Sequence, residues 1–454
     1  MPVASRRFGL PGRRAGKPSR FYLARPLALF WGLALCLATP LKAADLDFAG
    51  VLDKALARSH ELAIARLDTE YKEETVKETI YDFFPTVSLS GTNEYIKDLA
   101  GTGVTTVVGD SVFTASTAYQ DSYSANLRWR LLDFGVRSKQ LEAAELDVEA
   151  SRAGQDKTGL DLKVELLHAY RDALAAAKEI GTRKEMLPLL GEAASIQDRL
   201  YEAGRADRIS VVESQLRLAR TGRELRELAM NLSTALKRLT LYTGEDYPEA
   251  DTSMADFTPT VGAGLAWDPE KHPEMRQYAL AIQGKEAERD MVARSLWPTV
   301  DAYYQYNYYG ADPKSFAAAR DDVNERSYRV GLALSVPISE GFKKLHTMRK
   351  AELEAAKLRE ERARKLEALQ QNYLDLRQRH AFYQEDVRLR TAMLEDVEAE
   401  LAMLSRLLAG QAAERSTYLD QKVALLTQRL EMEKGLVSSA AALLELEFLA
   451  EATR

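Results

Sequence analysis

Histidine and cysteine are the side chains whose spacing best reveals metal binding, acid-base catalysis or thiol chemistry. The five histidines of this chain lie far apart and show no spacing typical of zinc ligands. No nucleophile stands beside a base in a known motif, and no glycine-rich phosphate loop is found. The sequence therefore predicts no enzymatic activity, no metal site and no cofactor. The histidines are His60, His168, His272, His346 and His380.

The only cysteine, Cys36, lies in an N-terminal segment with the features of a signal peptide. Residues 1–43 carry eight Lys or Arg and no acidic residue, and they contain an apolar run over residues 27–37. Leu35 stands before the cysteine, where a lipoprotein signal requires a small residue. We therefore expect cleavage after Ala43, no lipid anchor, and an exported chain without cysteine.

The exported part of the chain is acidic. Loss of the eight positive charges of the signal changes the formal net charge from −6 to about −14. This balance argues against a nucleic-acid-binding protein. After residue 43 no apolar run reaches the roughly 18 residues of a membrane-spanning helix.

A proline-free run of helix formers extends over Phe342–Ala409, between Gly341 and Gly410. Apolar residues within it alternate spacings of three and four, the pattern of a coiled coil, for about six heptads. Only His380 and Arg390 interrupt the apolar seam, and lone polar residues at such positions usually set the register of the helices. At 1.5 Å per residue the run predicts a helix of about 100 Å.

The same interval separates Gly135 from Gly204, and the stretch between them is also rich in helix formers. Pro188 predicts a kink or a break near residues 185–187, because its ring removes a donor and crowds the preceding turn. A further amphipathic helix is predicted over residues 45–84, since the residue before Pro85 is pushed out of the helical region.

The plan of the chain occurs twice, which is its most informative feature. Residues 44–242 predict helix, two strands, long helix, turn and helix, and residues 272–454 repeat this order. Residues 243–271, rich in glycine and proline, form an irregular connector. Both strand pairs start with an aromatic residue followed by Pro, Thr and Val, at Pro85 and at Pro298. The predicted strands are 86–97, 121–131, 300–309 and 327–336, with a polar loop over residues 101–118.

Strands of about ten residues have the length needed to cross a bilayer. In residues 121–131 apolar side chains alternate with polar ones that include Arg128 and Arg130, as expected between lipid and water. Four strands cannot close a barrel, and open edges in lipid leave backbone groups unpaired. Several chains must therefore contribute strands, and the long helices must all leave on the periplasmic side.

Over about residues 45–451 the chain resembles the outer-membrane efflux protein family, the TolC-type channels. The resemblance rests on the duplication, the two aromatic-Pro-Thr-Val strand starts, and the turns Tyr201-Glu202-Ala203-Gly204 and Leu407-Leu408-Ala409-Gly410. It implies a mainly α fold with membrane β: long antiparallel coiled coils form a periplasmic α-barrel, and four strands per chain join a trimeric twelve-stranded outer-membrane β-barrel. Residues 243–271 would form the equatorial region.

The resemblance also implies a function. The protein would be a homotrimer in the cell outer membrane and the exit duct of a tripartite efflux or type I secretion system. It would be a passive conduit from periplasm to exterior, working with a periplasmic adaptor and an inner-membrane transporter. It would contact outer-membrane lipid and no nucleic acid.

In this family the glycine turns lie at the periplasmic tip, where acidic residues ring the constriction. Asp420, in Leu419-Asp420, and Glu213 occupy the matching places here. The spacing from Gly410 to Asp420 is one residue longer than usual, and the second acidic residue expected a turn earlier is missing. A ring of carboxylates attracts cations and binds divalent ions. The tip residues expected at the turns and in adaptor contact are Gly204, Arg205, Arg208, Gly410 and Arg415, and these arginines could also pair with acids of neighbouring subunits.

Other interpretations remain open at this point. Asp420 and Glu213 also fit ordinary solvated helix residues. A periplasmic coiled-coil adaptor or scaffold would explain the long helices but not the two matched strand pairs. A trimeric adhesin would have its strands at the C-terminus, whereas this chain ends in a predicted helix over residues 443–450.

Overall fold

The computed structural model describes residues 46–97, 104–108, 111–115, 118–248, 253–258, 267–338, 340–409 and 414–453. The predicted signal peptide, with Cys36, and Gly410 lie outside these residues. In the described part of the chain, no helix is both long enough and apolar enough to cross a membrane.

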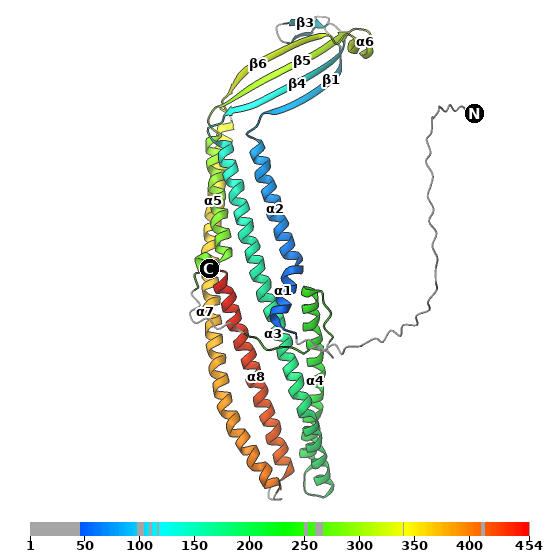
Figure 1. Cartoon of the computed structure of the whole chain (residues 1–454), viewed down its shortest axis with the longest axis vertical. Helices are drawn as coiled ribbons and strands as arrows, with labels where there is room; N and C mark the ends of the chain where they lie inside the picture. The colour runs from blue at the N-terminus through cyan, green and yellow to red at the C-terminus, as the bar shows by residue number, and fades with distance from the viewer. Residues whose placement is uncertain are drawn as a thin grey trace, which may run out of the picture. The chain divides into compact units, whose positions relative to one another are not determined.

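The described chain is mainly helical and carries one four-stranded antiparallel sheet (Figure 1). The helices are α1 (Phe48–Arg58), α2 (His60–Tyr81), α3 (Val136–Glu202), α4 (Arg208–Thr243), η1 (Pro269–Lys271), α5 (Pro273–Arg294), α6 (Phe316–Asp321), α7 (Glu340–Ala409) and α8 (Arg415–Glu451). The strands are β1 (Thr86–Ile96), β2 (Val104–Val108), β3 (Ser111–Ala115), β4 (Ala118–Leu132), β5 (Thr299–Asp312) and β6 (Glu325–Ser335).

The four long strands lie in the order β1-β4-β5-β6, so the pairing of β4 with β5 joins the two halves of the chain. Trp129 of β4, for example, lies opposite Ala302 of β5. The predicted mainly α fold with four antiparallel strands is confirmed. β2 and β3 pair only with each other, as a small separate hairpin.

Large apolar side chains gather on one face of the sheet, because the strands alternate apolar and polar residues. Exposed members of this face include Val87, Leu89, Tyr123, Trp129, Tyr304, Val330 and Leu332. On the other face Ser90 and Ser124 share a hydrogen bond of 2.7 Å, and Arg130 pairs with Asp301 at 3.0 Å. Part of this polar face borders a hollow of about 490 Å³.

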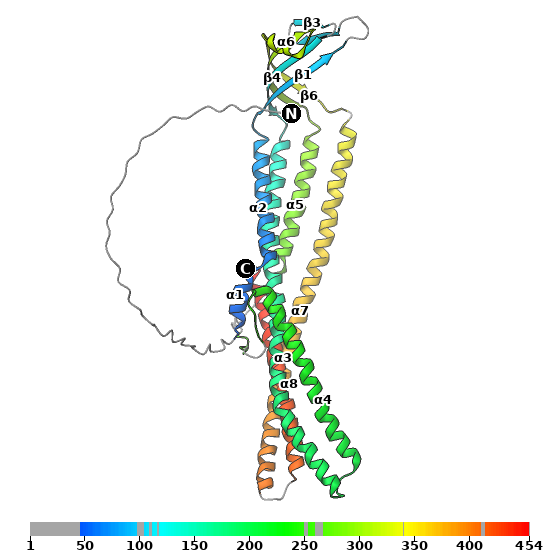
Figure 2. The same cartoon turned by 90° about the vertical axis from the view of Figure 1, so that its right-hand side faces the viewer.

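α3 is the central helix of the helical part, where it packs on α2, α4, α5 and α8. α7 packs on α5 near the sheet and on α8 further away. Figures 1 and 2 place the sheet at one end of α2, α3, α5 and α7, and the α3–α4 and α7–α8 turns at the opposite end. We call this opposite end the tip.

The heptad seam of α7 faces α8, as the sequence predicts. All thirteen seam positions are buried or half-buried, whereas most residues between them are exposed. These positions are Leu366, Leu369, Tyr373, Leu376, His380, Tyr383, Val387, Arg390, Leu394, Val397, Leu401, Leu404 and Leu408. His380 Nδ1 lies 3.0 Å from the Ser439 carbonyl oxygen of α8, and Arg390 donates to Gln428 of α8 at 3.3 Å. The two polar seam residues therefore fix contacts between these helices.

One helix prediction is wrong, and another is wrong in one of its two alternatives. Residues 45–84 form two helices rather than one, because the Ser59 hydroxyl accepts a hydrogen bond from the Leu62 N–H and so caps a new helix. The predicted break at Pro188 does not occur, because α3 continues through it, whereas the alternative of a kink stays a prediction. Met186 and Leu190 on either side are buried against Leu426 of α8, and this packing holds the helix where one hydrogen bond is lost.

The connections between strands are more structured than predicted. Within the predicted loop 101–118, residues 104–108 and 111–115 form the β2–β3 hairpin, and Ala118 already belongs to β4. Between β5 and β6 the short helix α6 packs on the sheet, and Arg320 pairs with buried Asp121 of β4 at 3.2 Å. Gly310 of β5 leaves room for the backbone at the end of α6. β5 is also longer than the predicted strand at both ends.

A buried aromatic cluster lies midway along α3. Tyr170 Oη is within hydrogen-bond distance of the carbonyl oxygens of Leu46 and Ala255, which precede α1 and belong to the connector. Phe48 and Phe257 pack on this ring, with centroids 5.5 and 5.2 Å from it. The start of the described chain and the connector are thus held on one helix. The division into repeats 44–242 and 272–454 with connector 243–271 stays a prediction.

Candidate functional site

The first tip turn joins α3 to α4 through Gly204, whose φ of 70° is in the left-handed region that favours glycine. The Arg205 N–H donates to the Leu200 carbonyl at 2.8 Å and so closes the end of α3. Asp207 then caps α4 by accepting from the Ser210 N–H at 2.9 Å. These local bonds explain why the chain reverses at this point.

The second tip turn joins α7, which ends at Ala409, to α8, which begins at Arg415. Gly410 lies outside the described residues. Arg415 makes a two-point ion pair with Glu192 of α3, with Nε–Oε1 at 2.9 Å and Nη2–Oε2 at 3.2 Å. The hydrogen bond from Arg415 lowers the pKa of Glu192. Arg415 therefore has an ion-pair partner, Glu192, within its own chain.

The predicted constriction residues are exposed on separate helices near the tip. Asp420 of α8 lies 3.4 Å from Arg217 Nη1 of α4, and both side chains are more than half exposed. Its neighbour Leu419 is buried and anchors this turn of α8. Glu213 is exposed on α4 and has no ion-pair partner among the described residues. The described residues do not bring the two carboxylates into contact with each other.

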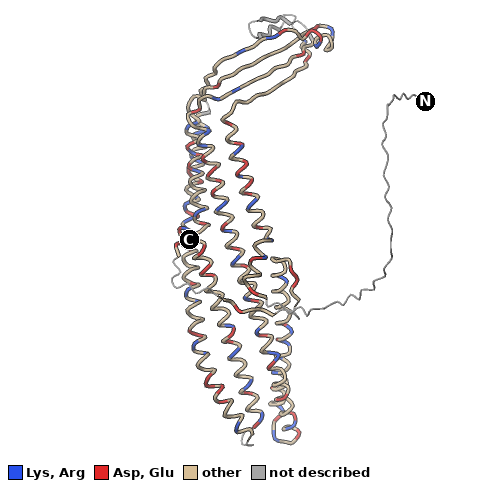
Figure 3. Tube along the Cα trace, in the orientation of Figure 1, with Lys and Arg blue, Asp and Glu red and all other residues tan. Residues whose placement is uncertain are grey.

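Arg205 and Arg208 are also exposed, and within the described chain neither forms an ion pair. Figure 3 shows that acidic and basic residues are spread along the helices down to the tip. The tip residues that the structure describes are therefore accessible to solvent, apart from the part of Arg415 that covers Glu192; they are Gly204, Arg205, Arg208 and Arg415.

A charged network that the sequence did not reveal connects three helices above the tip. Arg183 and Glu179 of α3 lie 2.7 Å apart, and Arg183 also reaches Glu224 of α4 at 2.6 Å. Lys434 of α8 lies 3.4 Å from Glu179. The four-residue spacing of Glu179 and Arg183 is a local signal of a helical ion pair, but their partners on α4 and α8 depend on the fold.

Pro85 and Pro298 lie directly before β1 and β5, each after the same short turn that follows a helix. Proline suits the first position of a strand, where its missing N–H is not needed by the ladder. Next to Pro85, the carbonyl of Phe83 accepts a hydrogen bond of 3.0 Å from the Trp129 indole. This contact fixes the start of β1 on β4.

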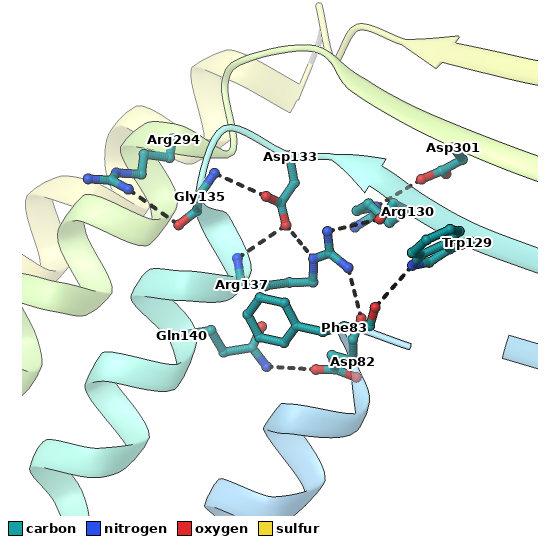
Figure 4. Close-up of polar contacts among 10 residues, drawn as sticks. All are labelled: Asp82, Phe83, Trp129, Arg130, Asp133, Gly135, Arg137, Gln140, Arg294 and Asp301. Atoms are coloured by element: carbon teal, nitrogen blue, oxygen red, sulfur yellow. Dashed lines mark hydrogen bonds and ion pairs between the residues drawn. The ribbon is translucent and has the colours of Figure 1, made fainter. Parts of the chain in front are cut away.

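A second set of residues that the sequence did not reveal locks the passage from β4 to α3 (Figure 4). Arg137 Nε lies 2.6 Å from Asp133 Oδ2, and its two terminal nitrogens donate to the carbonyls of Asp82 at 3.1 Å and Arg130 at 2.9 Å. The turn between them needs positive φ at Phe134 (53°) and Gly135 (85°). The guanidinium also stacks over Phe83, 4.9 Å from its centroid.

Burial of the Asp133 carboxylate opposes its ionisation, but its hydrogen bonds outweigh this effect. Arg137 donates through its side chain, and the Gly135 and Arg137 N–H groups donate at 3.0 and 3.2 Å. Together they lower the pKa of Asp133 below its ordinary value. The carboxylate is therefore charged at neutral pH and pairs with Arg137 there.

A model of the family described as outer membrane efflux protein matches residues 51–245. The sequence is also similar to Protein CyaE of Bordetella pertussis, with 23% identity over 357 residues that cover 76% of this chain and 72% of that protein. Residues 51–245 of the chain belong to the outer membrane efflux protein family. The protein is an outer-membrane channel for efflux or secretion. Its sheet lies in the outer membrane, and its helical part lies in the periplasm.

Solved structures agree with this assignment at the level of the fold. The outer membrane protein VceC from Vibrio cholerae has a TM-score of 0.71 and 14% identity, over 89% of this chain and 95% of that one. The CmeC outer membrane channel of Campylobacter jejuni has a TM-score of 0.72 and 13% identity, over 89% of this chain and 86% of that one. Both the family and the fold are those of channels.

Proposed function

We propose that this outer membrane efflux protein works as a homotrimer and as the passive exit duct of a tripartite efflux or type I secretion system. The observation that carries the proposal is the open four-stranded sheet. β1 and β6 each pair on one side only within the described sheet, and its apolar face is exposed. Edges of this kind must be paired in lipid, and three copies supply the twelve strands of a closed barrel.

At the tip, Asp420 and Glu213 line the constriction, each repeated three times around the axis. A ring of carboxylates attracts cations and binds divalent ions, whereas Arg217 next to Asp420 reduces this charge. Gly204, Arg205, Arg208, Gly410 and Arg415 form the surface that a periplasmic adaptor contacts. The adaptor connects the duct to an inner-membrane transporter, which provides the energy.

Envelope fractionation and native mass determination test this proposal. We expect a trimer that is extracted from the outer-membrane fraction only with detergent, and that co-purifies with a periplasmic adaptor after cross-linking. A monomer or dimer released without detergent would refute the proposal and favour a periplasmic coiled-coil scaffold. A trimer that does not co-purify with an adaptor would support the trimeric duct but refute its role in a tripartite system.

A further inference from the structure

We infer that Arg128 of β4 and Arg329 of β6 form an anion-binding site on the polar face of the sheet. The inference rests on the proposed duct, which turns this face toward the lumen and so exposes it to the exported solute. It adds the chemical class of that solute, which is an anion with a carboxylate or phosphate group. The residues of the site all belong to one chain, so the site does not depend on contacts between copies.

The strand register places the two arginines on either side of β5. Arg128 lies opposite Tyr303 of β5, and Tyr303 lies opposite Gly331 of β6. Gln305, the next residue of β5 on the same face, lies opposite Arg329. The two arginine backbones are therefore about 10 Å apart across the sheet, because neighbouring strands lie about 4.8 Å apart. Two long arginine side chains can reach one anion between them over this distance.

Neither arginine is neutralised by an acidic residue within the described chain. Both are exposed, and neither forms an ion pair there. Arg130, which lies two residues from Arg128 on the same face, instead pairs with Asp301 at 3.0 Å. Cations that line a water-filled pore without a partner attract anions. The planar guanidinium group also matches the geometry of a carboxylate or a phosphate.

The ring of Tyr303 lies low on the wall between the two arginines. A Cβ atom added at Gly331 would be 2.6 Å from Tyr303 Oη and 2.8 Å from Tyr303 Cζ. The end of the ring therefore occupies the space that a side chain at Gly331 would need, and it lies over β6 rather than pointing into the lumen. This arrangement leaves room for a solute above the ring. It also brings the phenol hydroxyl, a hydrogen-bond donor, to the strand of Arg329.

The hollow of about 490 Å³ borders the site on the side of Arg329. Among the described residues that line it, Arg329 is the only basic one. The neighbouring Gln305 and Asn307 are uncharged and bonded to each other, with Gln305 Nε2 donating to Asn307 Oδ1 at 3.0 Å. Arg329 therefore provides the charge at this end of the hollow, whose size suits a small organic solute.

Carboxylates lie on the same face further from the helices. Glu325 is four residues from Arg329 on β6, about 13 Å along the strand. Glu94 lies eight residues beyond the β1 position opposite Arg128. Both line the hollow together with Asp322, and within the described chain neither Glu94 nor Glu325 forms an ion pair. In the proposed duct these carboxylates repel anions that approach from outside and limit how tightly the arginines hold an anion from the periplasm.

Citrate binding to the detergent-extracted protein tests the site, by isothermal titration at low ionic strength, where charge attraction is least screened. Arg128→Gln and Arg329→Gln should each lower the affinity for citrate about fivefold, because each removes one charged contact with an exposed anion. The matched control is Arg326→Gln, which removes an exposed arginine of the same strand that lies opposite Tyr308 on the apolar face. This variant should bind citrate as tightly as the wild type.

Glu325→Gln gives an independent test of opposite sign. It removes a nearby negative charge and should raise the affinity for citrate about twofold. Equal citrate affinity in the wild type, Arg128→Gln and Arg329→Gln, or an equal loss in Arg326→Gln, would overturn the inference and leave the proposed trimeric duct intact. A native monomer that loses citrate affinity only in the Arg128→Gln and Arg329→Gln variants would refute the duct and support the anion site.

Discussion

Arg137 and Asp133 form a buried ion pair of 2.6 Å at the point where the sheet passes into the longest helix of the first half. The two side chains are only 12 and 9% exposed. The guanidinium also holds the carbonyls at the end of α2 and in β4, so one side chain fixes three segments. Its planar, five-donor geometry suits such a position better than that of lysine.

Arg137→Met is expected to lower the free energy of unfolding by about 3 kcal/mol, because it leaves the Asp133 carboxylate buried without its partner. Thermal unfolding of the purified protein measures the loss. Arg152→Met is the control, since its ion pair with Glu73 is 61 and 41% exposed and should contribute about 1 kcal/mol or less. Equal shifts of the thermal midpoint in the two variants would show that Arg137 does not stabilise the fold more than an exposed ion pair does.

The seam of α7 could be predicted because a heptad pattern is a property of one helix and its spacing is visible in the sequence. The strand starts at Pro85 and Pro298 could be predicted for a similar reason, since proline restricts its own backbone and that of the residue before it. The fold as a whole followed from the repetition of such local signals in the two halves.

Contacts between distant helices could not be predicted in this way. The pair Arg217–Asp420 joins residues about two hundred positions apart and depends on how α4 and α8 sit on α3. The break at Ser59 was missed because a single capping serine interrupts an otherwise continuous helical pattern. The continuity of α3 through Pro188 was missed because packing on α8 outweighs a local preference.

Protonation of His272 is expected to lower the free energy of unfolding at mildly acidic pH. Its Nδ1 caps α5 by accepting from the Glu274 N–H at 3.2 Å, and burial lowers the pKa of its imidazole. Above about pH 6.5 the ring is neutral in both the folded and the unfolded chain. Below this pH the unfolded chain binds a proton that the folded chain resists, so the free energy of unfolding decreases until the pH reaches the folded pKa.

His272→Asn keeps a capping acceptor and removes the titrating group, so it should lose less stability than the wild type between pH 7 and pH 5. Thermal midpoints at the two pH values measure this difference. His346→Asn changes an exposed histidine of α7 and should behave like the wild type. If His272→Asn kept the full pH dependence, another group would be responsible.

Gly204→Ala should destabilise the first tip turn by about 1 kcal/mol, because a side chain is strained at a φ of 70°. The added methyl group meets no atom within 4 Å, so the cost comes from the backbone alone. Gly181 is an exposed residue in the middle of α3, and a methyl group added there also meets no atom within 4 Å. Gly181→Ala should therefore stabilise the helix by up to about 1 kcal/mol. Amide hydrogen exchange at the tip and in α3 would detect the opposite signs. Slower amide exchange at the tip of Gly204→Ala than of the wild type would contradict the predicted backbone strain.

Asp420→Ala is expected to increase the leak of large antibiotics and to weaken block by divalent cations about tenfold, since loss of the carboxylate ring removes on the order of 1.4 kcal/mol of ion binding. Single-channel recordings with added Mg²⁺ measure the block. The control is Glu431→Ala, which removes an acidic residue of the same helix eleven residues further from the tip.

Arg217→Ala should have the opposite effect on the block by divalent cations. It removes the positive charge 3.4 Å from Asp420 and leaves the carboxylate more available to a divalent ion. Stronger block in Arg217→Ala together with weaker block in Asp420→Ala would identify the carboxylate as the ion-binding group of the constriction. If permeability and block were unchanged in Asp420→Ala, Asp420 would be an ordinary solvated residue of α8 and the constriction would have to be formed by other side chains.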